Sequence, residues 1–221
     1  MDLILQALPD FLDGIKNTII YCAVSFPLAL LLGFGLAQAS NSPILWLNKP
    51  ARIYIEVVRS TPMLAQIFLI YYGLSLFLAS YGLAPYDNAW TAGIATLALN
   101  YSAYEAEVFR AGFASVNKGQ GEAALSLGLT ERQSFFRIIF PQSIPLMIPP
   151  FANDLIYMLK DSAVVSFIGG YELTSKLDSW RNHNGSNVLP IYFLTIVCYL
   201  ILSMPISYFA RSFERRLRAA I

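Results

Sequence analysis

The stretch "NVLPIYFLTIVCYLILSMPISYFA", residues 187–210, runs for 24 residues without an Asp, Glu, Lys or Arg. A helix needs about 20 apolar residues to cross the hydrocarbon core of a bilayer. The rest of the chain has the same character, because 56% of its 221 residues are hydrophobic and only 13% are charged. Soluble domains carry about 25% charged residues. The sequence therefore predicts an integral membrane protein.

Four further apolar stretches precede this one. Three contain long runs without charge, and the fourth is apolar apart from Asp154. In lipid each backbone polar group must be satisfied within the segment, so every stretch is expected to be helical. We predict an all-α integral membrane fold, a single domain over residues 1–221, with about five spans. The predicted spans cover residues 15–38, 60–81, 88–111, 141–159 and 187–210, with a cytoplasmic loop over 112–140.

The distribution of Lys and Arg predicts the orientation of the chain. If the amino terminus lies outside, eleven of the 15 basic residues fall in inner segments and four in outer ones. Cytoplasmic loops of membrane proteins carry the excess of Lys and Arg. We therefore expect the carboxyl terminus and the 112–140 loop to be cytoplasmic.

Several classes of function are disfavoured. The net charge of +1 and the absence of a basic face argue against a nucleic-acid partner. Cys22 and Cys198 fall inside predicted spans, and His183 lies in an expected outer loop, so we predict no disulfide, no metal site and no hydrolase centre. No GxxxxGK[ST] motif is present, so the chain is not expected to bind ATP itself.

The segment after the fourth predicted span is expected to divide in two. Residues 162–173, "SAVVSFIGGYEL", are too few to span and predict a short helix at the outer surface. Residues 174–187, "TSKLDSWRNHNGSN", are polar and predict a mobile loop. Within the fourth span, the prolines at 145, 149 and 150 are expected to break the helix below Asp154.

Polar residues inside predicted spans are expensive and are therefore candidates for function. Asp154 lies near mid-depth, where its carboxylate could meet an ammonium group or pair with another helix. The candidate substrate-binding residues are Asp154, Asn153, Asn100, Tyr104, Tyr101 and Glu105.

Four charged residues near the ends of spans are candidates for structural or gating roles. Glu107 precedes Arg110 by three residues, so an intrahelical ion pair is favoured over ligand contact. Lys160 and Asp161 are expected at the outer end of the fourth span, as a gate or a structural ion pair.

The segment "EAALSLGLTERQSFFRIIFPQ", residues 122–142, is a charged stretch between two apolar ones. Its first residues favour a short helix, Gly128 suits the end of that helix, and Thr130 can cap the next. Pro141 is expected to mark the start of the following span. Periodicity alone is equally consistent with an ordinary amphipathic helix on the inner surface.

This segment resembles the EAA signature of ABC-importer permeases, because "EAALSLG" is followed after nine residues by "IIFP". Phe140 stands where leucine is usual, which exchanges one apolar residue for another. The resemblance to the polar amino-acid branch of this family covers essentially the whole chain. It includes "VRSTPMLAQIFLIYYGL" (58–74), "SAYEAEVFRAGFASVNKGQGEAA" (102–124) and "KDSAVVSFIG" (160–169).

The resemblance implies a type I importer permease of the bacterial inner membrane that carries a polar or charged amino acid by alternating access. Glu122, Ala123, Ala124 and Gly128 match the coupling helix, which docks on a separate ATP-hydrolysing subunit. The implied partners are two such subunits, which bind ATP and Mg²⁺, a second permease chain, identical or paralogous, and an extracytoplasmic solute-binding protein. The alternative is a channel or receptor whose inner helix has no ATPase partner.

Overall fold

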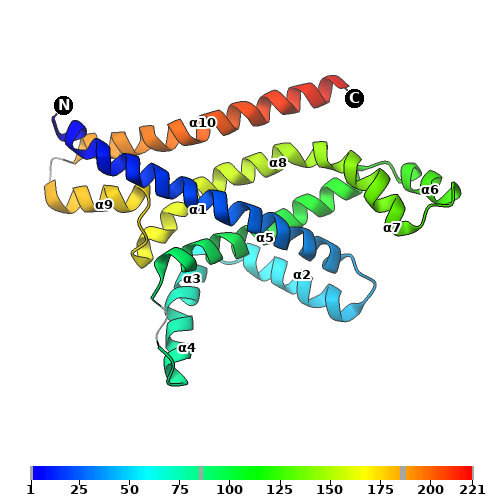
Figure 1. Ribbon diagram of the computed structural model, residues 1–221, viewed down its shortest axis with the longest axis horizontal. Coiled ribbons are helices and arrows are strands. Elements are labelled where there is room, and N and C mark those ends of the chain that lie inside the picture. The colour runs from blue at the N-terminus through cyan, green and yellow to red at the C-terminus, as the bar shows by residue number, and fades with distance from the viewer. Residues whose placement is uncertain (1, 85–86, 185–187, 221) are drawn as a thin grey trace.

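The computed structural model describes residues 2–84, 87–184 and 188–220, and these ranges contain helices and connecting turns without a strand (Figure 1). The predicted all-α class is confirmed. The elements are α1 (Asp2–Ser40), α2 (Leu45–Arg59), α3 (Met63–Phe68), the π-helical turn η1 (Leu69–Gly73), α4 (Leu74–Ser80), α5 (Ala89–Ser115), α6 (Lys118–Ser126), α7 (Glu131–Ser134), the π-helical turn η2 (Phe135–Ile139), α8 (Phe140–Asp161), the 3₁₀ helix η3 (Ser162–Ile168), α9 (Leu173–Asn184) and α10 (Leu189–Ala220).

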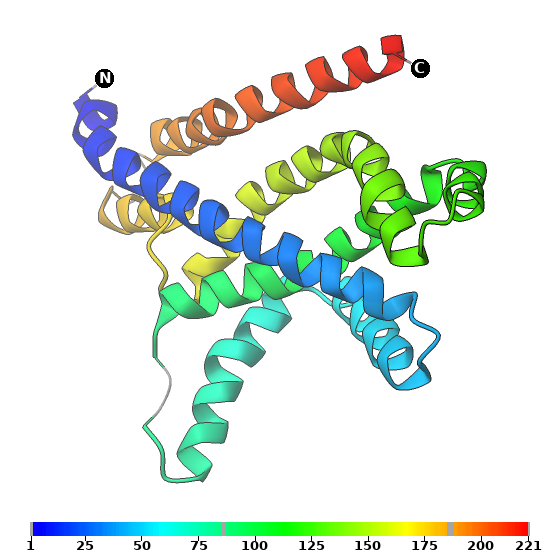
Figure 2. The ribbon, with the colours of Figure 1, turned by 45° about the vertical axis from the view of Figure 1, so that its right-hand side comes forward.

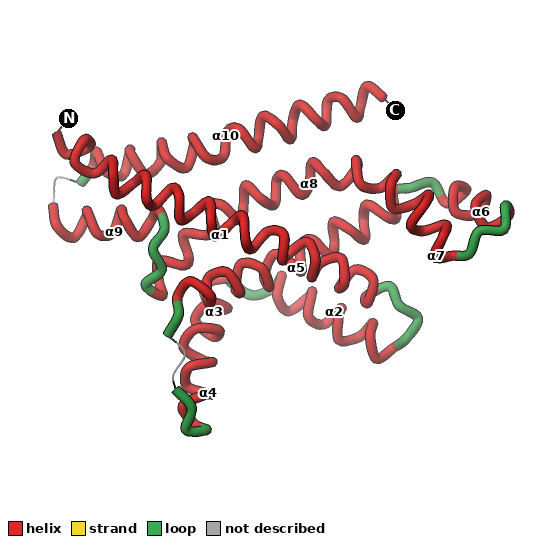
Figure 3. The backbone as a smooth tube through the Cα atoms, in the orientation of Figure 1, coloured by secondary structure: helices red, strands yellow, loops and turns green. Residues whose placement is uncertain are grey.

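The long helices α1, α5, α8 and α10 extend along the longest axis of the molecule, and α3 and α4 project to one side (Figures 1 and 2). The amino terminus and α9 lie at one end, whereas α6, α7 and the carboxyl terminus lie at the other (Figure 3). The predicted outer segment and the predicted cytoplasmic loop are thus at opposite ends, as two sides of a membrane require.

Helices cover all five of the predicted spans. Three of the described helical segments are long and apolar enough to cross a bilayer by length and composition: Leu3–Ser40, Met63–Ser80 and Leu189–Leu217. α5 and α8 are long enough, but they carry more polar and charged residues. The five-span division therefore stays a prediction, and the predicted start of the last span, residue 187, lies outside the described residues.

Helix α1 packs along α5 through small side chains. Ala29 and Ala37 on α1, and Ala103 and Ala106 on α5, are all buried, with exposures of at most 1%. Transmembrane helices lack a hydrophobic force between them, so small residues are used to bring their backbones close together. The pairing of α1 with α5 is of this kind.

These two helices approach each other closely at Gly33. A Cβ atom added to Gly33 would lie 2.7 Å from the Glu105 Cβ and 3.0 Å from the Ser102 carbonyl oxygen. The Ser102 oxygen belongs to the α5 backbone and the Glu105 Cβ is bonded directly to it, so neither atom can rotate away. The helix contact therefore requires glycine at position 33.

A buried carboxylate joins α9 to α10 at the predicted outer end. Glu172 is 0% exposed and accepts hydrogen bonds from the backbone N–H groups of Thr174 and Ser175, each at 2.8 Å. The Tyr199 hydroxyl of α10 donates to the same carboxylate at 3.1 Å. Burial raises the pKa of the Glu172 carboxyl, and these donors oppose that shift.

The expectation of a mobile loop over 174–187 is wrong for its described part, because α9 continues to Asn184 and includes His183. Glu172 satisfies the first amides of α9, and the indole of Trp180 donates to Asp10 on α1 at 2.9 Å. Leu173 is fully buried among apolar side chains of α1 and α10. Tertiary contacts therefore stabilise a helix whose composition is that of a loop. Residues 185–187 lie outside the described ranges.

The expected break at the α8 prolines is also wrong. The helix runs without interruption from Glu131 through the η2 turn to Asp161, and Pro145, Pro149 and Pro150 lie within it. Membrane helices tolerate proline because neighbouring groups and local π adjustments satisfy the freed backbone atoms. Pro141 lies in the first turn of α8, as the sequence predicts for the start of that element, although the η2 turn leads into α8 without a break.

We predict that Gly33→Ala lowers the free energy of unfolding by about 1–3 kcal/mol, because the added methyl forces α1 away from α5. Gly35→Ala is the matched control, since a Cβ at Gly35 of the same helix meets no atom within 4 Å. That substitution should be neutral or stabilising, as alanine is the better helix former. Unfolding of both variants in detergent checks the difference, and equal stabilities would contradict the close packing.

Candidate functional site

A side-chain amide network joins α5 to α3 and the end of α2. Asn100 is 4% exposed and donates to the Gln66 side-chain oxygen at 2.9 Å. The Gln66 amide in turn donates to the Val58 carbonyl at 2.9 Å and to the Thr61 hydroxyl at 2.8 Å. Sequence reasoning selected Asn100 but missed Gln66, although Gln66 is a polar residue inside a predicted span and the same signal could have found it.

Lys160 and Asp161, at the carboxyl end of α8, have different partners. Asp161 accepts a 2.8 Å hydrogen bond from the hydroxyl of Tyr101, which is 3% exposed. The Lys160 ammonium lies 4.6 Å from the centre of the Tyr157 ring. Within the described residues no ion pair joins Lys160 to Asp161. Asp161 thus connects α8 to α5 through a tyrosine.

Two carboxyl groups lie on the neighbouring helices α5 and α8. Asp154 of α8 is half-buried, and Glu105 of α5 is 0% exposed. Neither Glu105 carboxyl oxygen has a hydrogen-bond partner among the described residues. Asn153, beside Asp154, is exposed. The structure therefore gives Asp154 and Asn153 an open side, whereas Glu105 is enclosed by α1 and α5.

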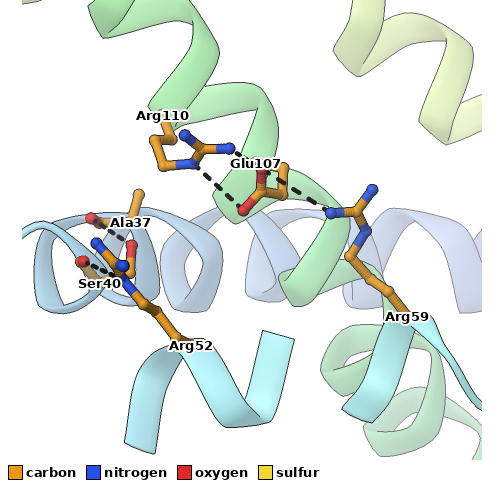
Figure 4. A network of polar contacts seen from close by, with 6 residues as sticks. All are labelled: Ala37, Ser40, Arg52, Arg59, Glu107 and Arg110. Atoms are coloured by element: carbon orange, nitrogen blue, oxygen red, sulfur yellow. Dashed lines mark hydrogen bonds and ion pairs between the residues drawn. The ribbon is translucent and has the colours of Figure 1, made fainter. Parts of the chain in front are cut away.

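An ion-pair network lies nearer the α6 end of α5 (Figure 4). The predicted intrahelical pair of Glu107 and Arg110 is confirmed, with the Arg110 Nε donating at 3.3 Å. Arg59 of α2 lies 3.9 Å from the same carboxylate and 5.5 Å from the centre of the Tyr104 ring. Glu107 thus bridges α2 and α5, and Tyr104 is packed against a guanidinium.

This network lines a polar cavity of about 580 Å³ between the end of α1, α2 and α5. Arg52 closes one side by donating to the Ser40 carbonyl at 3.1 Å, which satisfies a free carbonyl at the end of α1 (Figure 4). Three arginines and two glutamates face the cavity. The balance of charge in it is positive.

The segment that carries the EAA motif has the expected helix–turn–helix form. The Asn117 side chain caps α6, and Gly128 follows that helix with φ of 85°, a left-handed conformation that glycine adopts without strain. Thr130 then caps α7, and its hydroxyl and the Gln133 side chain form a reciprocal capping box. The predicted roles of Gly128 and Thr130 in the chain path are confirmed.

The α6 side chains divide between the chain itself and its outer surface. Glu122 and Ala123 are exposed, but Ala124 is 4% exposed and packs against its own chain. Leu125 is 46% exposed and Leu127 is 84% exposed, although this stretch is otherwise polar. The exposed surface therefore combines a carboxylate, a small residue and two large apolar side chains.

The comparisons with known proteins agree with this geometry. Residues 11–219 match the family model described as the inner membrane component of binding-protein-dependent transport systems. The chain belongs to this family.

Similar proteins and a solved structure indicate which class of transport system the chain resembles. The chain is 33% identical to the L-cystine transport system permease protein TcyB of Bacillus subtilis, over 98% of this chain and 90% of that protein. It is 41% identical to the octopine transport system permease protein OccM of Rhizobium radiobacter, over 76% and 70% of the two chains. A crystal structure of an amino acid ABC transporter with histidines superposes with a TM-score of 0.86 at 36% identity, covering 96% of each chain.

The predicted fold and function class are thus confirmed: the chain is a membrane permease subunit of the amino-acid ABC importer type, and the channel or receptor alternative is not supported. It is an inner-membrane protein. The assignment of individual residues to substrate or ATPase contact stays a prediction.

We predict that Gln66→Leu lowers the free energy of unfolding by about 1–3 kcal/mol, because it leaves the Asn100 amide without its acceptor and removes a donor from the Val58 and Thr61 carbonyls. In a double-mutant cycle with Asn100→Leu, the two effects should be non-additive by about 0.6–1.7 kcal/mol. Gln38→Leu, at an exposed position of α1, is the control and should change little. Additive losses at positions 66 and 100 would show that the amides act separately.

Proposed function

We propose that this chain is one of two permease chains in an importer that is driven by two separate ATP-binding subunits. In this proposal those subunits bind ATP and Mg²⁺, and a solute-binding protein delivers an amino acid at the α9 end. The membership of the family supports this assembly. The amino terminus is placed outside and the carboxyl terminus in the cytoplasm, because eleven of 15 basic residues then lie inside.

The observation that carries the proposal is the exposed surface of α6. Large apolar side chains exposed on a polar cytoplasmic segment are typical of a protein contact. Leu125 and Leu127 provide such side chains, and Ala123 allows a partner to approach the backbone closely. Glu122 adds a carboxylate that can pair with a basic group. Ala124 is buried and packs α6 against the rest of its own chain.

A continuous helix connects this surface to the proposed substrate site. α7, the η2 turn and α8 form one helix from Glu131 to Asp161, and that helix carries Asp154. Close-packed helices shift as units and are not continuously deformable. A displacement of α6 by the ATP-binding subunits is therefore transmitted to Asp154 through α7 and α8.

The proposed substrate site is centred on Asp154, whose carboxylate can bind an α-ammonium group. Asn153 is the exposed neighbour that can add an amide contact. In this conformation three other predicted contacts are occupied within the chain. Asn100 donates to Gln66, Tyr101 donates to Asp161, and the Tyr104 ring lies against Arg59.

These three side chains and the enclosed Glu105 become substrate contacts only when the helices separate. The two conformations thus differ in the polar groups that they offer to the ligand. Such a difference in affinity is what alternating access requires. The Arg59–Glu107–Arg110 network lies toward the inner end and is proposed to close that side of the pathway.

We predict that Gly128→Ala in the assembled importer lowers substrate-stimulated ATP hydrolysis about tenfold. An L-residue at φ of 85° costs about 1–2 kcal/mol, so the turn shifts and α6 loses its orientation. Gly82→Ala is a matched control, because Gly82 has φ of 71° and open space around it, but lies in the loop after α4. It should retain stimulation. Equal hydrolysis by the two variants would refute the coupling role.

We predict that Asp154→Asn weakens transport of the cognate amino acid by roughly tenfold or more, because a charge-assisted hydrogen bond is worth about 1.5–3 kcal/mol. Binding to ATPase subunits and basal hydrolysis should be unchanged. Uptake into proteoliposomes across a panel of amino acids measures the effect, with Asp178→Asn on α9 as the control for loss of one carboxylate. Unaltered uptake by Asp154→Asn would remove Asp154 from the substrate site.

A further inference from the structure

An apolar groove lies between α1, α8 and α10, and it shares no lining residue with the polar cavity described above. Its volume is about 450 Å³. The side chains that line it include Phe26 of α1, Phe151 and Leu155 of α8, and Pro205, Ile206 and Phe209 of α10. No charged or hydrogen-bonding side chain lines it. The three helices that form it all belong to predicted spans, so the groove lies at the depth of the hydrocarbon core.

The rim of the groove is accessible. Phe209 is 57% exposed, and on the neighbouring turns of α10 Met204 and Tyr208 are more than 60% exposed. In a membrane this surface meets lipid. A groove open to lipid with a wholly apolar lining is suited to a hydrocarbon chain.

A basic residue follows the groove on the same face of α10. Arg216 comes seven residues after Phe209 and eleven after Pro205, which is close to two and three helical turns. The Phe213 ring stacks with that of Phe209 at 6.2 Å and continues the apolar face toward Arg216. Arg216 is exposed and lies about 10 Å further along the helix than Phe209.

The spacing from an apolar groove to an arginine matches the two parts of a phospholipid. We infer that the groove binds one acyl chain of an anionic phospholipid, whose phosphate is held near Arg216 at the cytoplasmic end of α10. Basic sites beside transmembrane helices on the cytoplasmic side recognise anionic lipid headgroups. Arg211 and Arg215, also exposed, add positive charge on adjacent faces.

A lipid fits the groove better than a second protein chain. Protein interfaces combine an apolar core with a polar rim and hydrogen bonds. The lining of this groove offers no such partner, and the basic residues nearest to it along α10 lie at one end of that helix. The complementarity is therefore with a molecule that is apolar over most of its length and anionic at one end.

Native mass spectrometry of the full importer complex, purified with a mixture of phosphatidylglycerol and phosphatidylcholine, tests this inference. We expect one phosphatidylglycerol retained per permease chain in preference to phosphatidylcholine. Arg216→Ala should reduce that preference about fivefold, the factor expected for one arginine near an anionic surface. Arg132→Ala, at an exposed basic position of α7, should not alter it.

Ala152→Trp fills the groove from α8 and should remove lipid of both kinds from it, because Ala152 is part of the lining. If that variant does not assemble, the comparison of Arg216→Ala with the wild type decides the test by itself. Equal retention of the two lipids by the wild type, or an unchanged preference in Arg216→Ala, would overturn the inference. Loss of the second permease chain with unchanged lipid retention in Ala152→Trp would do the same, and would make the groove a subunit contact. The readout is lipid mass, so it is independent of amino-acid transport.

Discussion

The close packing of α1 on α5 is the contact on which the rest of the structure depends. Gly33 permits this contact, because any side chain there would meet the α5 backbone. Glu105 lies directly behind it and is enclosed as a result. α2 then follows α1 through a short turn, and Arg52 donates to the last carbonyl of α1, so the polar cavity between α1, α2 and α5 takes its shape from the same contact.

Polar groups inside the membrane are arranged in two ways in this chain. Asn100 with Gln66, and Tyr101 with Asp161, are paired across helices at hydrogen-bond distances below 3 Å. Such pairs satisfy buried polar atoms and hold α5 against α3 and α8. Glu105 is unpaired and Asp154 is half open. The paired groups stabilise one conformation, whereas the incompletely paired carboxyls are the ones that a ligand or a helix movement can satisfy.

The two ends of the molecule differ in how firmly they are held. At the α9 end, Glu172 and Trp180 join three helices by partly buried hydrogen bonds. At the other end, α6 rests on its own chain mainly through Ala124, and its remaining surface is exposed. Because the α9 end is joined across three helices and the exposed α6 lies beyond the other end of the continuous α7–α8 helix, an external force at α6 acts on the core.

The sequence by itself determined the membrane class, the helical content, the turn at Gly128 and the Glu107–Arg110 pair. Each of these depends on composition, on local backbone preference or on contacts within one turn of helix. The EAA motif likewise identified the family, since its residues and gaps are local.

The tertiary structure alone decided the properties that depend on contacts between distant segments. Helix α9 exists because Glu172 and Trp180 find partners on other elements, and α8 stays continuous because a membrane helix with packed neighbours tolerates its prolines. The enclosure of Glu105, the role of Gln66 and the inward orientation of Ala124 also follow from packing. No local pattern specifies which helix will lie against a given face, so these features could not be predicted from the sequence.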